Sequence, residues 1–172
     1  NNGFTVLLGL LIMICLYLMI LFVFTGRKPG WFLKGIAPAQ LLGFSTSSSA
    51  AALPVTIERA TKHLGVDNEV ASFVLPVGAT INMDGTSLYQ AIAAVFIAQA
   101  LHIPLDISDQ LTIVLTALLA SIGSAAVPGA GMIMLVIVLE SIGIPADKMA
   151  IGLALMFAID RPLDMCRTVV NI

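Results

Sequence analysis

Charged residues are scarce in this chain. They make up 10% of its 172 residues, whereas hydrophobic residues make up 59% and the mean hydropathy is +1.04. A soluble domain carries about 25% charged residues, so this chain has too few to cover a water-facing surface. The composition predicts a membrane protein surrounded by the lipid bilayer. The formal net charge of −2 provides no basic surface, so no nucleic-acid partner is expected.

Cysteine and histidine are nearly absent, with two of each. Cys15 and Cys166 lie in apolar stretches without metal-ligand spacing, so we expect neither a disulfide framework nor a zinc site. His63 and His102 fall in predicted loops. A serine such as Ser48 therefore has no obvious base, which argues against an intramembrane serine hydrolase.

Long apolar runs, by contrast, are abundant. Residues 4–24 hold no charge and are long enough for a transmembrane helix, which needs roughly 20 apolar residues. The run is too long for the apolar part of a signal peptide, which has about 7–15 residues. The chain opens at Asn1 without Met or a charged leader, and it stops at Ile172 within a helical pattern. We therefore expect a piece of a longer protein.

Two apolar stretches break in the middle. Residues 31–62 are interrupted by the serine-rich segment 45–49, and residues 111–142 by the Gly- and Pro-rich segment 123–131, which will not continue a helix. Each half is too short to span a bilayer at about 1.5 Å per residue. Both stretches are thus predicted to be re-entrant helical hairpins.

Two further apolar stretches complete the pattern. Residues 70–101 are interrupted by polar residues at 80–86, and residues 150–172 form a final helix with four charges. Polar loops are expected between the segments, at 58–69, 102–110 and 143–148. The predicted fold is an all-α membrane protein of transmembrane helices, two re-entrant helical hairpins and an interrupted helix. Paired discontinuous segments of this kind point to the binding site of a transporter.

The basic residues set an expected orientation. Five of them between residues 27 and 62 fall on one side of the membrane if the first hairpin returns to its own face, and Lys148 falls on the other. The side richer in Lys and Arg is expected to be cytoplasmic. The first hairpin then enters from the cytoplasm and the second from outside.

The final helix carries the strongest chemical signal. Asp160, Asp164, Arg167 and Asn171 are spaced four, three and four residues apart, which places them on one helix face beside Thr168. A charge at membrane depth costs at least about 2.5–3.5 kcal/mol, so such groups face a partner or an aqueous path. Arg167 can bind a carboxylate through two parallel hydrogen bonds, and Asp164 can accept from an ammonium group. This pairing describes an acidic amino acid, although an internal Asp–Arg pair that only holds the bundle together fits the same pattern.

The hairpin tips add further polar groups. A half-helix that starts at Ser47, Ser48 or Ser49 turns its free N–H groups and its positive dipole end inward, which suits a carboxylate. Alternatively, these serines only cap the helix. The half-helix that ends near residues 121–124 leaves carbonyl groups that suit sodium, or it is merely a glycine-rich bend.

The polar interruption at residues 80–86 contains a carboxylate without a basic residue nearby. Asp84 has no basic residue within one turn, so it is protonated, binds a cation or finds a distant partner. We favour a cation, held together with Asn82 and with carbonyl groups of residues 78–82. Thr86 offers a hydroxyl to the side-chain carboxylate of the ligand.

These stretches resemble the glutamate/aspartate transporter family, the dicarboxylate/amino acid:cation symporters. The resemblance covers nearly the whole chain. It rests on FSTSSS at 44–49 with LPV at 53–55, LPVGATINMDGT at 75–86, ASIGS at 120–124 with VPGAG at 127–131, and DMCRTVVN at 164–171. It implies that residues 1–172 are part of one substrate-binding transport domain.

The resemblance also implies a role for each matching residue. The first tip would bind the α-carboxylate of the substrate, Asp164 the amino group, and Thr86 with Arg167 the side-chain carboxylate, while residues 127–131 would form an outer gate. The implied substrate set is Ser47, Ser48, Ser49, Thr86, Val127, Pro128, Gly131, Asp160, Asp164, Arg167, Thr168 and Asn171. The implied sodium set is Gly78, Thr80, Asn82, Asp84, Ser121, Ile122, Ser124 and Asn171.

Coupling ions and assembly follow from the same resemblance. It implies cotransport of sodium ions (or protons) by alternating access, without an organic cofactor. It further implies a homotrimer formed through a scaffold domain absent from this chain, in a multi-pass protein of the bacterial inner membrane. Ala50, Ala52 and Ala126 depart from common family residues. Arg167 disfavours the neutral amino-acid branch and Asp164 the C4-dicarboxylate branch, the two alternatives within the family.

An enzyme is the alternative from another class. An intramembrane aspartyl hydrolase would need a pair such as Asp84 and Asp160, but their flanking residues do not resemble known enzymes of that kind. A channel or a purely structural bundle would have no reason to stack Asp164 and Arg167 beside two hairpin tips. We therefore predict a carrier.

Overall fold

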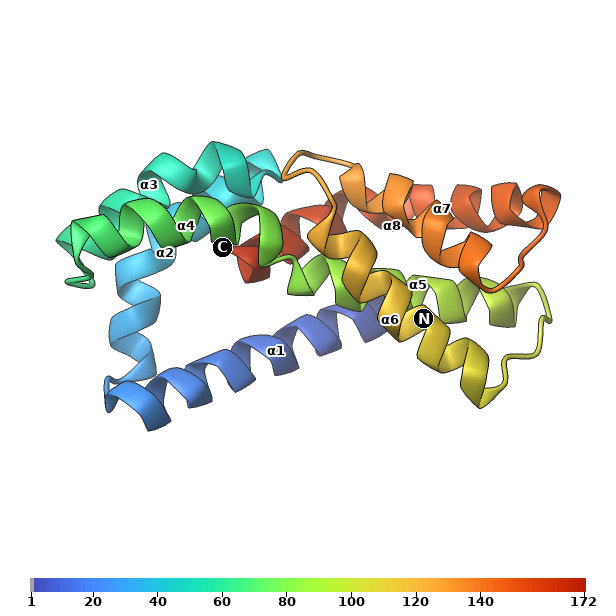
Figure 1. Ribbon diagram of the computed structural model, residues 1–172, viewed down its shortest axis with the longest axis horizontal. Helices are drawn as coiled ribbons and strands as arrows, with labels where there is room; N and C mark the ends of the chain where they lie inside the picture. Colours follow the sequence, from blue (N-terminus) through green and yellow to red (C-terminus); the bar gives the residue numbers. More distant parts are fainter. Residues whose placement is uncertain (1) are drawn as a thin grey trace.

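The computed structural model describes residues 2–172, and all of their regular secondary structure is helical. The helices are α1 (Asn2–Thr25), α2 (Pro29–Thr46), α3 (Ser49–Lys62), α4 (Asn68–Ile81), α5 (Asp84–Ala100), α6 (Ile107–Ile122), α7 (Ala130–Ser141) and α8 (Ala146–Asn171). Figure 1 shows an elongated molecule with α2, α3 and α4 at one end, α5 to α8 toward the other, and α1 along one long side. The predicted all-α class is confirmed.

Two helix pairs turn within the segments that the sequence singles out. Ser47 takes a left-handed φ of 52° as the C-cap of α2, and the Ser48 side chain caps α3 by accepting from the Ala51 N–H. Between α6 and α7, Gly129 takes a φ of 79°, for which glycine has no steric penalty. Local backbone chemistry thus sets both turns.

The third apolar segment consists of two helices. α4 ends at Ile81 and α5 begins at Asp84. In the short break, the Asn82 N–H donates to the Gly78 carbonyl at 2.7 Å and the Met83 N–H to the Ile81 carbonyl at 2.9 Å. The break brings the carbonyl end of α4 next to the N–H end of α5.

The expected loops are too long, because neighbouring helices extend into them, and the loop at 58–69 is shortened at both ends since α4 begins at Asn68. α3 continues through Lys62, and a one-turn ion pair with Glu58 at 3.1 Å stabilises its last turn. α6 begins directly after Asp106, which forms a reciprocal capping box with Asp109. α8 begins directly after Pro145, whose extended backbone leads into the helix.

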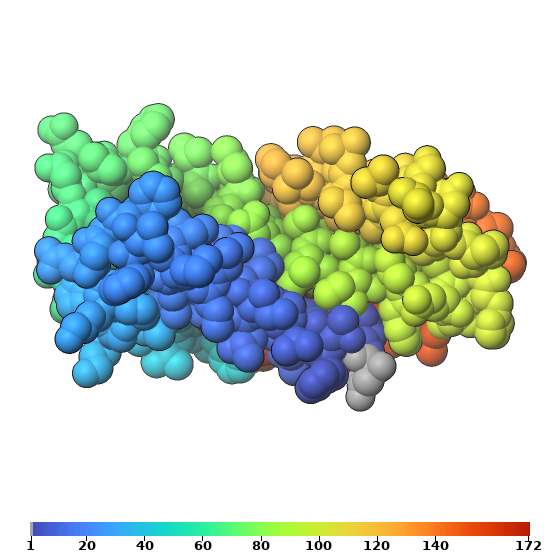
Figure 2. All heavy atoms as spheres, turned by 90° about the horizontal axis from the view of Figure 1, so that it is seen from below, coloured from blue at the N-terminus to red at the C-terminus, as the bar shows by residue number. Residues whose placement is uncertain are grey.

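The apolar core lies among α1, α5, α6, α7 and α8. On α1 the core-facing side chains recur at helical spacing, from the buried Val6 and Leu10 to Met13 and Tyr17. Much of the remaining surface of α1 is large, apolar and exposed. Within residues 2–172, α1 is the one helix long and apolar enough to cross a membrane by length and composition alone. Figure 2, seen from below, shows α1 at the molecular surface.

Candidate substrate and cation site

Both hairpin tips, the break between α4 and α5, and the end of α8 converge near the middle of the molecule (Figure 1). They line a small central cavity of about 20 Å³. The predicted substrate residues that line it are Ser47, Ser49, Thr86, Val127, Gly131, Asp164, Thr168 and Asn171. The fold therefore gathers side chains from distant parts of the sequence into one place.

The two tips touch through Ser48. Its hydroxyl donates to the carbonyl oxygen of Ala126 at 2.6 Å and accepts from the Ala51 N–H at 3.1 Å. One side chain thus caps α3 and fastens it to the second tip. Pro128, also in the predicted substrate set, is exposed on the second tip and does not line the cavity.

Arg167 lies at the centre of a buried charged cluster. Its Nη2 is 2.9 Å from one oxygen of Asp164 and 3.1 Å from an oxygen of Asp160, and its side chain is 1% exposed. The other oxygen of Asp164 accepts from the Gly129 N–H at 3.0 Å. Asp164 is therefore shared between Arg167 and the second tip. Asp160 pairs with Arg167, and neither of these two residues lines the cavity.

The ring of Tyr89 supports the guanidinium group. Cζ of Arg167 lies 3.8 Å from the ring centroid, a cation–π geometry, and Tyr89 is fully buried. Within residues 2–172, Nε and Nη1 of Arg167 have no hydrogen-bond partner. Because buried donors without partners are costly, these nitrogens suit an incoming carboxylate. Sequence reasoning missed Tyr89, although its place one turn after Thr86 on the same helix was a usable signal.

Asn171 joins the central cavity to the break between α4 and α5. Its Nδ2 donates to the Thr86 hydroxyl at 3.1 Å, and its Oδ1 accepts from the Gly85 N–H at 2.8 Å. Its carbonyl oxygen accepts from Nδ2 of Asn82 at 3.2 Å. A Cβ at Gly85 would lie 2.9 Å from the carbonyl oxygen of Arg167, so the close packing of α5 on α8 requires glycine.

Two groups of predicted cation ligands share a cavity or groove. Gly78, Asn82 and Asn171 line a cavity of about 230 Å³, which shares Asn171 with the central cavity. Asn82 and Asp84 line a groove of about 400 Å³ between α4 and α6. No cluster of three or more His, Cys, Asp or Glu side chains forms in residues 2–172. A cation here would rely largely on carbonyl, amide and hydroxyl oxygens, as sodium does in transporters.

Of the remaining predicted cation ligands, Ser124 lines the central cavity and Ile122 the groove, whereas Thr80 and Ser121 line neither. Thr80 is exposed, and its hydroxyl donates to the Val77 carbonyl at 2.9 Å. The Ser121 carbonyl already accepts from the Ser124 N–H at 3.1 Å, while Ile122 lines the groove. In the part of the chain that the structure describes, no hydrogen bond joins Thr80 to the second tip.

The family of the chain follows from a comparison with known proteins. Residues 3–172 match the Sodium:dicarboxylate symporter family. The chain belongs to this family. The matching family is one of symporters and not of hydrolases, which favours the predicted carrier over the intramembrane hydrolase.

Three similar proteins, all from animals, are excitatory amino acid transporters. Excitatory amino acid transporter 5 of Mus musculus is 46% identical over 164 residues, which cover 95% of this chain and 28% of the relative. Excitatory amino acid transporter 1 of Homo sapiens is 46% identical over 169 residues, covering 98% and 30%. Excitatory amino acid transporter 2 of Homo sapiens is 45% identical over 169 residues, covering 98% and 29%. The chain thus spans less than a third of the length of these relatives.

Proposed function

We propose that this chain is the substrate-binding part of a carrier that moves an acidic amino acid, aspartate or glutamate, across a membrane together with sodium. The observation that carries the proposal is the buried pair of Arg167 and Asp164, 2.9 Å apart, beneath two touching hairpin tips. An adjacent cation and anion complement a ligand with both an ammonium group and an extra carboxylate. The names of the relatives support the same substrate class.

Each charged group of the proposed substrate has a partner. Arg167, with two unpaired nitrogens, would hold the side-chain carboxylate together with Thr86. Asp164 would hold the ammonium group. The N–H groups at the start of α3, behind the Ser48 cap, would hold the α-carboxylate, as helix N-termini do for anions. Ser47, Ser49, Thr168 and Asn171 would complete the pocket walls.

The second tip, at residues 127–131, is the proposed outer gate. The central cavity of about 20 Å³ has room for about one water molecule, so an amino acid requires the tip to move. That movement separates the Gly129 N–H from Asp164, and the substrate ammonium takes its place. Gate opening thus exchanges one partner of Asp164 for another.

Sodium is the proposed coupling ion, in keeping with the family name, and protons are the alternative. Gly78, Asn82 and Asn171 would form one sodium site, and Asn82 with Asp84 a second. A third would use Thr80 with residues 121–124 of the second tip, which requires α4 and α6 to approach each other. Cation binding would then organise the pocket before the substrate enters and the core moves by alternating access.

The membrane arrangement extends the proposal. α2 with α3 would enter from the cytoplasm and α6 with α7 from outside, both as re-entrant hairpins. Assembly would be a homotrimer through a scaffold domain outside this chain. The bacterial inner membrane expected from the sequence stays a prediction, because the relatives named above come from animals.

The two alternatives within the family fit the charged cluster less well. A C4-dicarboxylate has no ammonium group for Asp164. A neutral amino acid has no second carboxylate for Arg167. In either case one of the two charged groups would gain no contact from the ligand.

Equilibrium binding to the purified full-length parent protein tests the proposal. Radiolabelled L-aspartate would be titrated with and without sodium, with succinate and L-serine as competitors. Strong sodium dependence with weak competition by both is expected. Effective displacement by succinate would show that Asp164 does not bind an amino group, and sodium-independent binding would contradict sodium coupling.

A further inference from the structure

Tyr17 is the one polar side chain with an oxygen or nitrogen atom between Thr5 and Thr25 of α1. A phenol hydroxyl in such an apolar helix needs a hydrogen-bond partner, since a bare polar group is costly in a membrane. Val6, Leu10 and Tyr17 share the face of α1 that packs on the core. Tyr17 is therefore turned toward the core helices and not toward lipid.

The partner of Tyr17 is Asp84, the first residue of α5. The phenol hydroxyl donates to Oδ2 of Asp84, joining residues 67 positions apart in the sequence. Among residues 2–172, Asp84 takes part in no ion pair and accepts from no other side chain. Its Oδ1 is therefore left for a different partner.

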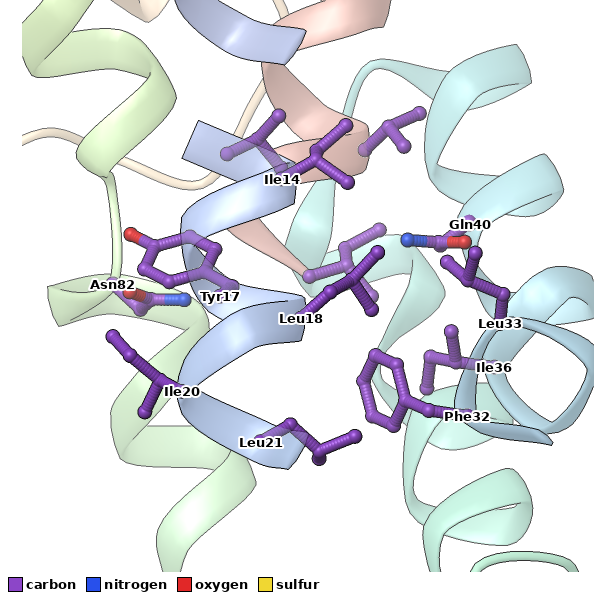
Figure 3. Close-up of a pocket in the computed structure, with 13 residues that line it drawn as sticks. Ile14, Tyr17, Leu18, Ile20, Leu21, Phe32, Leu33, Ile36, Gln40 and Asn82 are labelled. Atoms are coloured by element: carbon purple, nitrogen blue, oxygen red, sulfur yellow. The ribbon is translucent and has the colours of Figure 1, made fainter. Parts of the chain in front are cut away.

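The surroundings of Asp84 differ on its two sides. Tyr17 and Asn82 lie close together at one edge of a cavity of about 340 Å³ between α1 and α2, whose other walls are mainly apolar (Figure 3). On the other side, Asn82 and Asp84 line the groove between α4 and α6. The carboxylate is thus held from the α1 side and can be reached from the groove side.

We propose that Tyr17 is a positioning residue for a cation site at Asp84, because its hydrogen bond fixes one carboxylate oxygen and leaves the other to bind the ion. This inference rests on the proposed sodium-coupled function and adds a residue of α1 to that site. Hydrogen bonds of this kind orient metal ligands, and their removal typically costs about 10–100-fold in metal affinity. The same bond ties α1 to the break between α4 and α5.

The test compares Tyr17→Phe with the wild type in the purified full-length parent. Phenylalanine keeps the ring and its packing and removes only the donor. We expect the sodium concentration for half-maximal L-aspartate binding to rise about 10–100-fold, with unchanged L-aspartate affinity at saturating sodium. Without substrate, the sodium-induced rise in melting temperature should require correspondingly more sodium. Thr25→Val is the matched control, since the Thr25 hydroxyl bonds only nearby backbone of α1 and Arg27.

The outcomes separate this inference from the proposed function. An unchanged sodium requirement in Tyr17→Phe, with sodium dependence intact in the wild type, would overturn the inference alone. A wild type without sodium dependence would overturn both. If Tyr17→Phe does not fold, Tyr17→Gln, which keeps an N–H donor, takes its place. A sodium requirement of Tyr17→Gln close to that of the wild type would then support the inference. Asp84→Asn, which removes the proposed cation ligand, provides the upper reference, and a sodium requirement of Tyr17→Gln as high as in that variant would overturn the inference.

Discussion

At the scale of single residues, the guanidinium group of Arg167 packs closely against Gly131. A Cβ at this position would lie 2.7 Å from Nη1 of Arg167, closer than real contacts allow. Nη1 is one of the two nitrogens without a partner in residues 2–172. Glycine at position 131 therefore lets the guanidinium group keep its present position, and a larger residue would require Nη1 to shift.

Gly131→Ala should accordingly weaken the recognition of a second carboxylate. We expect L-aspartate affinity to fall at least about tenfold, or about 1.4 kcal/mol, because Arg167 must shift. L-Serine, which has no second carboxylate, should lose less. Equilibrium competition binding measures both, with Gly30→Ala as control because no atom lies within 4 Å of a Cβ there. Equal losses for both ligands would show a general disturbance of the tip.

Asp164→Asn tests the ammonium contact. Asparagine keeps an oxygen for the Gly129 N–H but removes the charge. L-Aspartate binding should weaken by about 2–5 kcal/mol, the usual cost of truncating one partner of a buried charge pair. Succinate should then compete better relative to L-aspartate. The control is Asp147→Asn in the exposed first turn of α8. Unchanged L-aspartate affinity would contradict the assigned role of Asp164.

At the scale of elements, the hydroxyl of Ser48 links one hairpin to the other. It caps α3 and also bonds the Ala126 carbonyl. A cap contributes about 1 kcal/mol and one further hydrogen bond about 0.5–1.5 kcal/mol. Energies of this size can bias a tip between closed and open positions without unfolding the helices.

Ser48→Ala should therefore favour the open second tip. A cysteine introduced at Val127 should react faster with a thiol reagent in this background, because Ala126 has lost its link to α3. Ser45→Ala is the matched control, since the exposed Ser45 hydroxyl bonds only Leu42 within its own helix. The link would be irrelevant to gating if both backgrounds reacted at the wild-type rate.

At the scale of the whole molecule, the proposed symport requires ion and substrate to influence each other through shared structure. If substrate raises sodium affinity by some factor, sodium raises substrate affinity by the same factor, typically worth about 1–3 kcal/mol. Asn171 contacts both proposed sites, through Thr86 on one side and Asn82 on the other. We therefore expect Asn171 to transmit this coupling.

Asn171→Ala should reduce the coupling factor as well as both affinities. The factor is obtained by titrating L-aspartate at several sodium concentrations and comparing the shift with that of the wild type. Asn68→Ala, at the exposed start of α4, serves as control. A coupling factor that stays constant while both affinities fall would mean that coupling runs through other residues.

The sequence predicted the helical class and the positions of the helix breaks, because serine caps, glycine and proline act locally. It also placed Asp164 and Arg167 on one face, since helical spacing alone does so. It could not predict that Tyr17 bonds Asp84, because that contact depends on how α1 packs on α5. The start of α6 at Ile107 was equally hidden, since polar residues suit both a loop and an exposed helix end.

The double role proposed for Asn171 also restricts how carriers of this kind evolve. A lineage that acquires a new substrate must preserve ion coupling at every intermediate step, and a change at Asn171 alters both at once. Arg167 and Gly131 lie on the substrate side and make no hydrogen bond to the break between α4 and α5 within residues 2–172. Diversification of substrate range should therefore begin at those two positions, while position 171 keeps its asparagine.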